Sequence, residues 1–133
     1  MKTLRVRDVM AQHYTTLQPE QSLASAVARL LSYRQSAAPV VEQQRLIGIL
    51  SEADCLRATL LEGYFNEGVA LVKDQMNSSP ETISPEAEIA TATEAFLKDN
   101  RRMMPVVEAG VLVGILTREN ILKSLLEAGE KKH

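Results

Sequence analysis

The feature that most constrains this chain is an internal repeat of long period. At an offset of 66 residues the sequence aligns positions 6–57 with 72–123 without a gap, and 18 of those 52 pairs are identical. Only two copies fit in 133 residues, and the period exceeds that of common solenoid repeats. The repeat therefore predicts two copies of one fold that pair with each other rather than an open array. We assign the first copy to residues 1–66 and the second to residues 67–133.

Each copy predicts the same order of elements, βαββα, and an α/β (α+β) fold. Helical spacing of apolar residues predicts amphipathic helices, and short apolar runs bounded by turn residues are typical of buried strands. A proline inside each first apolar strand, Pro39 or Pro105, favours a sheet edge. In the first copy we expect one or two helical turns at 6–10, a brief strand near 15–18, a helix at 22–33, strands at 37–42 and 46–50, a helix at 52–62 and a loop at 63–68.

In each copy the last apolar strand ends in a hydroxyl residue that opens a helix. The first copy has Ser51 followed by Asp54, and the second has Thr117 followed by Asn120. Backbone N–H groups at a helix start can meet an anion, and a carboxylate can accept two hydrogen bonds from a sugar diol. Helix capping alone also explains the spacing, with Ser51 as the cap and Asp54 as a surface carboxylate.

Composition excludes several classes of function. The net charge of −2 offers no basic surface for nucleic-acid binding, and the single cysteine, Cys55, excludes an internal disulfide and a cysteine-based zinc site. Ile121 occupies the equivalent position in the second copy, so we expect an inert buried thiol. The N-terminal residues do not resemble a secretory signal, and no apolar run is long enough to span a membrane. We therefore expect a cytoplasmic protein without catalytic or metal-binding residues.

The ordered motifs resemble a tandem pair of CBS (cystathionine beta-synthase) domains, the arrangement called a Bateman module. The resemblance covers residues 4–127 and rests on four segments that recur one period later: 8–10, 16–19, 39–42 and 48–54. It implies two repeats that pack face to face with pseudo-two-fold symmetry. It also implies two clefts, which bind adenosine-containing ligands in many relatives, and a protein that senses rather than catalyses.

The resemblance also assigns residues to the first cleft. Ser51 and Asp54 would contact phosphate and ribose, and Arg118, one residue beyond the second cap, would be the phosphate partner. Arg101 and Arg102 are further candidates for the phosphate, although exposed loop charges are favoured for these two, and a solvated helix start is the alternative for Arg118. Backbone and apolar atoms from two segments would hold the adenine: Tyr14, Thr15 and Thr16 from the first, and Ala37, Ala38 and Pro39 from the second.

The second cleft is predicted to be weaker, because it lacks the carboxylate and has a bulky pair, Met103 and Met104, where the first has two alanines. Methionine in an apolar strand more often fills a core, which is the alternative for Met103 and Met104. The residues assigned to this second site are Thr82, Met104, Pro105, Thr117 and Asn120.

The favoured function is a regulatory module that binds AMP, ADP or ATP, chiefly in the first cleft. S-adenosylmethionine and NAD contain the same adenosine group and are further candidates. The signal would pass to a separate effector protein through a homodimer formed by the closing helices, whose apolar faces contain Leu56, Leu60, Leu122, Leu125 and Leu126. The alternative for these leucines is that they close the core of the single chain. The alternatives are a ligand-free structural or dimerisation scaffold and, least favoured, a small enzyme.

Overall fold

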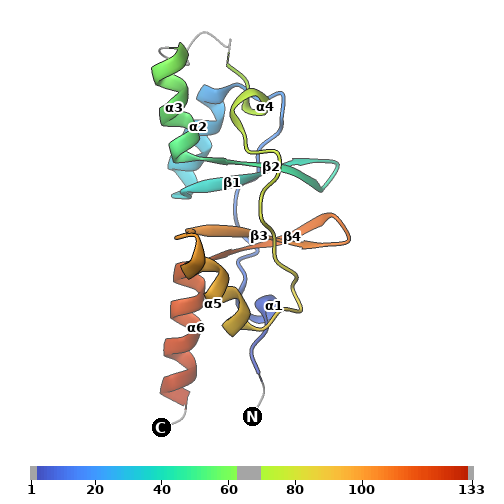
Figure 1. Cartoon of the computed structure of the whole chain (residues 1–133), viewed down its shortest axis with the longest axis vertical. Coiled ribbons are helices and arrows are strands. Elements are labelled where there is room, and N and C mark those ends of the chain that lie inside the picture. Colours follow the sequence, from blue (N-terminus) through green and yellow to red (C-terminus); the bar gives the residue numbers. More distant parts are fainter. Residues whose placement is uncertain (1–2, 63–69, 132–133) are drawn as a thin grey trace. The chain divides into compact units, whose positions relative to one another are not determined.

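The computed structural model describes residues 3–62 and 70–131, and its elements follow the predicted order twice (Figure 1). The predicted loop at 63–68 and the division at residues 66 and 67 lie outside the described residues. The elements are α1 (Val6–Val9), α2 (Leu23–Tyr33), β1 (Ala37–Glu42), β2 (Arg45–Ser51), α3 (Glu52–Glu62), α4 (Val72–Gln75), α5 (Ile89–Lys98), β3 (Met103–Glu108), β4 (Val111–Thr117) and α6 (Arg118–Lys131). The α+β class and the predicted helices are confirmed.

The chain forms two compact units that cut across the sequence repeat. The Ser51 unit comprises Tyr14–Pro80, and the Thr117 unit comprises Met1–His13 together with Glu81–His133. The opening segment of each copy packs with the later elements of the other copy: Val6 N–H donates to Ala87 O at 2.8 Å, and Val72 N–H donates to Gln21 O at 2.9 Å. The repeat is thus a unit of sequence, whereas each packed unit draws on both copies.

The two hairpins have the same register. β1 pairs antiparallel with β2 from Ala37↔Ser51 to Glu42↔Arg45, and β3 pairs with β4 from Met103↔Thr117 to Glu108↔Val111. Each pairing shifts register at the same place in its first strand. The turn residues have positive φ in both hairpins, which is the conformation that a tight two-residue connection needs: Gln43 and Gln44 in one, and Ala109 and Gly110 in the other.

The brief strand predicted before each first helix is reduced to a single bridge. Leu17 forms a parallel bridge with Val40, and Ile83 forms the equivalent one with Val106. β1 is an end strand of its sheet, as its proline predicts, and only the isolated bridge flanks it there, with Leu17 N–H donating to the carbonyl of Pro39 at 2.9 Å. The bridge is short because the next rung would require an N–H at Pro39, and proline has none.

Each hairpin is also crossed by the opening segment of the other copy, at a glycine. In the Ser51 unit, Ile49 and Asn77 exchange two backbone hydrogen bonds of 2.9 Å. A Cβ at Gly48 would lie 2.6 Å from Met76 Sδ and 2.9 Å from Asn77 O. Gly114 in the Thr117 unit faces Met10 and Ala11 in the same way. The glycine of each repeated motif therefore permits a close crossing of the backbone.

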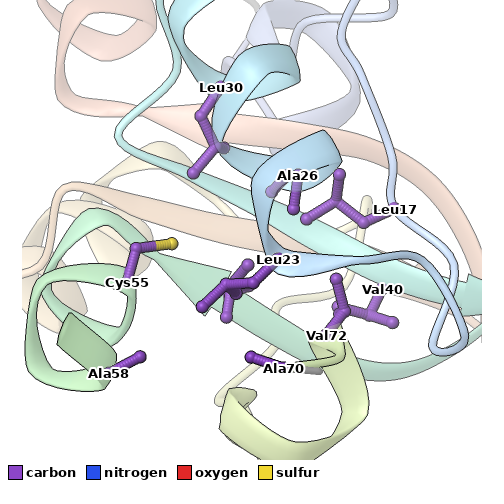
Figure 2. Packing of buried hydrophobic residues seen from close by; sticks show 11 residues of the cluster. Leu17, Leu23, Ala26, Leu30, Val40, Cys55, Ala58, Ala70 and Val72 are labelled. Carbon is purple, nitrogen blue, oxygen red and sulfur yellow. The ribbon is translucent and has the colours of Figure 1, made fainter. Parts of the chain in front are cut away.

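Each unit has its own apolar core beneath two helices. Figure 1 shows α2 and α3 side by side over the β1–β2 hairpin, and α5 and α6 likewise over the β3–β4 hairpin. Figure 2 shows the cluster of the Ser51 unit, in which α2, α3, α4 and β1 all contribute side chains. Within the described residues, no helix is both long enough and apolar enough to cross a bilayer.

Candidate functional site

The hydroxyl residue at the end of each hairpin forms a reciprocal helix cap. Ser51 N–H donates to Asp54 Oδ2 at 2.9 Å, and Asp54 N–H donates to Ser51 Oγ at 3.1 Å. Thr117 and Asn120 make the same two bonds at 3.0 and 3.1 Å. The capping role that the spacing predicts is thus present in both units, and it does not depend on the charge of the fourth residue.

Capping leaves binding capacity on Ser51 and Asp54. The second oxygen of Asp54 accepts from Arg57 at 3.0 Å, and the side chain of Asp54 is only 18% exposed. A carboxylate offers about four lone-pair sites, and these two bonds use half of them. The Ser51 hydroxyl accepts a bond in the cap, so its proton can be donated elsewhere. Two groups suited to ribose and phosphate therefore lie at the start of α3.

The residues predicted to hold an adenine lie at the same end of the β1–β2 hairpin. Ala37 pairs with Ser51 in the ladder, and Thr15 is joined to Ala37 by the side chain of Gln35. Thr15 is 1% exposed, and its hydroxyl accepts a hydrogen bond of 2.8 Å from Arg29. Tyr14 and Thr16, on either side, are half-buried. The Ser51 unit therefore brings together the first-site residues, apart from Arg118, which belongs to the other unit.

The strand residues predicted to line the two sites are mainly buried in the cores. The side chains of Ala38 and Met104, at equivalent positions, belong to the apolar clusters of their units. Pro39 and Pro105 are fully buried as well. Met104 therefore fills the core of the Thr117 unit, as the alternative for this residue expected, and Met103 is 7% exposed. Any contact of Ala38 with a ligand would come from its backbone.

The residues assigned to the second site differ from their first-site counterparts in exposure and charge. Thr82 is exposed, and Asn120 offers an amide where the Ser51 unit offers a carboxylate. Arg118 is exposed and donates from Nε to Arg101 O at 2.5 Å and from a terminal nitrogen to Asn100 Oδ1 at 2.5 Å. These bonds join α6 to the segment before β3. The predicted contact of Arg118 with a phosphate stays a prediction.

The sequence analysis did not single out Gln35, which lies near the end of the β1–β2 hairpin. Gln35 and Arg101 occupy equivalent positions, 66 residues apart. Arg101, expected to be an exposed loop charge, has a side chain only 31% exposed. Its Nε lies 2.5 Å from Glu81 Oε1 as an ion pair without hydrogen-bond geometry. The sequence could have drawn attention to this position, because Gln35 in one copy is replaced by Arg101 in the other. The difference alone does not predict what either side chain contacts.

Burial raises the pKa of two ionisable groups in the Ser51 unit, Cys55 and Tyr14. Burial, reinforced by the carboxylates of Asp54 and Glu52, raises the pKa of Cys55 from 9.0 to about 11, so the thiol is protonated at neutral pH. Burial also raises the pKa of the Tyr14 phenol. Among the described residues, no group of three or more His, Cys, Asp or Glu side chains could hold a metal ion.

A separate apolar groove lies between α2 and α3. It has a volume of about 340 Å³ and is lined by none of the residues predicted to bind a ligand. Its wall contains the exposed Leu31 and Leu56 together with the half-buried Thr59. The groove belongs to the outer, helical side of the Ser51 unit.

Two solved structures resemble the whole chain. CBSX2 of Arabidopsis thaliana, solved in complex with AMP, is 27% identical with a TM-score of 0.83 over 94% of this chain and 98% of its own. A putative acetoin utilization protein, AcuB, from Vibrio cholerae is 26% identical with a TM-score of 0.88 over 98% of both chains.

An enzyme also contains a similar region. The A-adding tRNA nucleotidyltransferase of Aquifex aeolicus is 33% identical over 129 residues, which are 96% of this chain but only 15% of the enzyme. The chain therefore spans a small part of that relative.

The sequence model of the CBS domain matches residues 6–61 and again residues 71–127. The chain belongs to the CBS domain family and carries two copies of the domain.

Proposed function

We propose that this pair of CBS domains is a regulatory module that binds an adenosine-containing ligand, chiefly through the Ser51 unit, with AMP, ADP or ATP as the leading candidates. The observation that carries the proposal is the meeting of three kinds of group at one end of the β1–β2 hairpin. These are the partly free carboxylate of Asp54, the donor hydroxyl of Ser51 and the backbone of Thr15 beside Ala37. The resemblance to CBSX2, solved with AMP, supports the same class of ligand.

The chemistry of this end matches the parts of a nucleotide. A carboxylate accepts both hydroxyls of a ribose, and the start of α3 with the Ser51 hydroxyl suits a phosphate. Asn120 at the equivalent position has no charge, so the Thr117 unit would bind the same ligand more weakly. Binding would alter how the protein engages a separate effector protein.

The direct test is isothermal titration of wild type and Asp54→Asn with AMP, ADP, ATP, S-adenosylmethionine and NAD. Asn120 already caps α6 through the same bonds, so the substitution keeps the fold of the cap. Hydrogen bonds to a charged acceptor contribute about 1.5–3 kcal/mol. We therefore expect affinity to fall by at least about tenfold.

The matched control is Glu52→Gln, which removes a carboxylate from an exposed position in the same helical turn. It should leave affinity unchanged. Equal affinity in wild type, Asp54→Asn and Glu52→Gln would remove Asp54 from the site.

A ligand-free scaffold is the alternative, and thermal unfolding separates the two functions. A ligand at a hundred times its dissociation constant stabilises the folded state by about 2.7 kcal/mol. We expect an adenine nucleotide to raise the melting temperature. The absence of any shift across the five compounds would favour the scaffold.

The predicted role of Arg118 is tested separately. A guanidinium matches phosphate geometry, so Arg118→Ala should weaken ATP more than adenosine. Equal small losses for both ligands would show that Arg118 only holds the segment containing Asn100 and Arg101.

We also propose that the protein pairs with a second copy of itself through its outer helices. Isolated exposed leucines are ordinary, but here three leucine positions are exposed in both units at the repeat offset. Within each closing helix two of them are four residues apart, which places them on one face. The pairs are Leu31 with Leu97, Leu56 with Leu122, and Leu60 with Leu126, each at least 65% exposed.

Sedimentation velocity on wild type and on Leu60→Lys combined with Leu126→Lys tests this pairing. Leu60 is 86% exposed, so the fold should tolerate the charge, as far-UV circular dichroism would verify. We expect wild type to sediment at twice its 14.7 kDa and the variant at the single-chain mass. A wild type that stays at 14.7 kDa at high concentration would contradict the proposal.

A further inference from the structure

The side chain of Gln35 occupies the backbone hydrogen-bonding groups of Thr15. Its carbonyl oxygen Oε1 accepts from Thr15 N–H at 2.7 Å, and its Nε2 donates to Thr15 O at 3.3 Å and to Ala37 O at 3.1 Å. Thr15 N–H can only donate and the two carbonyls can only accept, so the orientation of the amide is fixed. The side-chain amide of Gln35 is therefore hydrogen-bonded to both the backbone N–H and the backbone C=O of Thr15.

The backbone of Thr15 is available because of Pro39. The parallel bridge of Leu17 with Val40 uses Leu17 N–H to Pro39 O and Val41 N–H to Leu17 O. In the next rung, two residues back, Thr15 C=O would accept from the N–H of residue 39, and proline has no N–H. The ladder stops, and the N–H and C=O of Thr15 face the gap that Gln35 fills.

A primary amide and an adenine present the same edge to such a gap. The amide has an acceptor oxygen and a donor NH₂ on one carbon, and adenine has the acceptor N1 and the donor N6 amine on one carbon. Either can accept from Thr15 N–H and donate to Thr15 C=O. In this structure the amide of Gln35 forms the pair of bonds that an adenine would form.

The Thr117 unit has no equivalent amide. Glu81 and Arg101 replace Thr15 and Gln35, and they form an ion pair. An adenine edge would have to compete there with two opposite charges rather than with a neutral amide. The two units therefore differ at the end that would hold the base as well as at Asp54.

We propose that Gln35 is a built-in competitor of the ligand's base, which must swing away from Thr15 before an adenine can pair with that backbone. This inference rests on the proposed function and names the group that regulates access to the same site. Gln35 is half-buried, lies two residues before β1 and is outside the apolar cluster, and this position allows the movement.

Titration of AMP into wild type, Gln35→Ala and Gln35→Asn tests the proposal. The alanine variant removes the amide and the asparagine variant shortens it, so each frees the Thr15 backbone. We expect AMP to bind about tenfold more tightly to both variants, which corresponds to about 1.4 kcal/mol. Melting temperatures without ligand should fall slightly, because the bonds of Gln35 to Thr15 and Ala37 are lost.

Gln21→Ala is the matched control. Gln21 also uses its side-chain amide on a backbone group, accepting from Gln18 N–H at 3.1 Å, but it does not contact Thr15. Its loss should leave AMP affinity unchanged. In wild type, the side-chain amide signals of Gln35 in nitrogen–proton correlation spectra should shift and exchange faster with water when AMP is added.

The outcomes separate this inference from the proposed function. If wild type binds AMP and the two Gln35 variants bind it equally or more weakly, the competitor role is overturned and the function stands. If wild type and both variants bind none of the nucleotides, both are overturned. Binding by the variants alone, or more tightly than by wild type, supports both.

Discussion

The Ser51 unit and the Thr117 unit share three features that serve the fold and differ at positions where a ligand would bind. Hairpin register, reciprocal cap and glycine crossing recur in both. The pairs that differ include Asp54 and Asn120, Gln35 and Arg101, and Thr15 and Glu81. Duplication has therefore preserved the geometry of the site and changed its charge and hydrogen-bonding groups. One copy retains groups that suit a nucleotide.

The largest expected effect concerns the shared glycine crossing. Alanine at Gly48 would place Cβ 2.9 Å from Asn77 O, and at Gly114 3.1 Å from Ala11 O. Backbone atoms cannot move aside as the methionine side chains can, and such overpacking costs about 1–3 kcal/mol. Urea denaturation should show both variants destabilised, with Gly48→Ala the worse.

Gly129→Ala is the control for these variants, because nothing lies within 4 Å of its added methyl group. It should be neutral or stabilising by up to about 1 kcal/mol, since alanine favours a helix. If Gly48→Ala and Gly114→Ala behave like Gly129→Ala, the crossing is not close.

The next prediction concerns whether these differing residues explain why the two units would bind AMP unequally. Glu81→Thr, Arg101→Gln and Asn120→Asp together give the Thr117 unit the groups of the Ser51 unit. Because a charged acceptor strengthens a hydrogen bond by about twofold, we expect calorimetry to detect an additional AMP bound per chain. The affinity of that site should rise by roughly tenfold, equivalent to about 1.4 kcal/mol.

The double variant Glu81→Thr with Arg101→Gln changes only the residues at the end that would hold the base and leaves Asn120 in place. We expect its AMP affinity to rise less than that of the triple variant. Unchanged stoichiometry in the triple variant would mean that other residues make the two units unequal.

A smaller expected effect is a pH dependence of stability that arises in the Ser51 unit alone. Cys55 in the Ser51 unit titrates, and its counterpart Ile121 does not. The folded pKa is raised to about 11 from 9.0, so the folded state holds the proton more tightly than the unfolded state. This stabilisation is complete below pH 9 and is lost as pH rises toward about 11.

Between pH 8 and pH 10 we expect wild type to lose about 1 kcal/mol more unfolding free energy than Cys55→Ala, because one pKa unit corresponds to about 1.4 kcal/mol. Urea unfolding of both proteins at the two pH values measures this difference. Parallel losses in the two proteins would contradict the buried, protonated thiol.

The smallest expected effect concerns the ion pair of Arg57 with Asp54. The Arg57 side chain is 62% exposed, and such surface pairs contribute about 0.2–1 kcal/mol. Arg57→Ala should lower the melting temperature only slightly. Lys123 occupies the equivalent position, three residues after the neutral Asn120, so Lys123→Ala should lower the melting temperature less still. A larger fall in melting temperature for Lys123→Ala than for Arg57→Ala would contradict the stabilising role of the Arg57–Asp54 ion pair.

The elements and caps were predictable because their determinants are local. The strand β1 matches the predicted bounds, and α2 begins after Ser22, whose hydroxyl accepts from Ser25 N–H at 3.1 Å. The Ser51–Asp54 and Thr117–Asn120 caps join residues three apart, so the spacing in the sequence contains the geometry. The brief strands were overpredicted, because the proline that ends the ladder at Leu17 lies in a different strand.

The amino-acid sequence by itself determined the duplication, the order of elements, both caps and the difference in charge between Asp54 and Asn120. Only the tertiary structure decided that the opening segment of each copy packs in the unit of the other, that Gln35 pairs with the backbone of Thr15, and that Arg101 meets Glu81. These contacts join residues about twenty or more positions apart. Their partners depend on where folding brings the backbone, and spacing along the chain does not specify that.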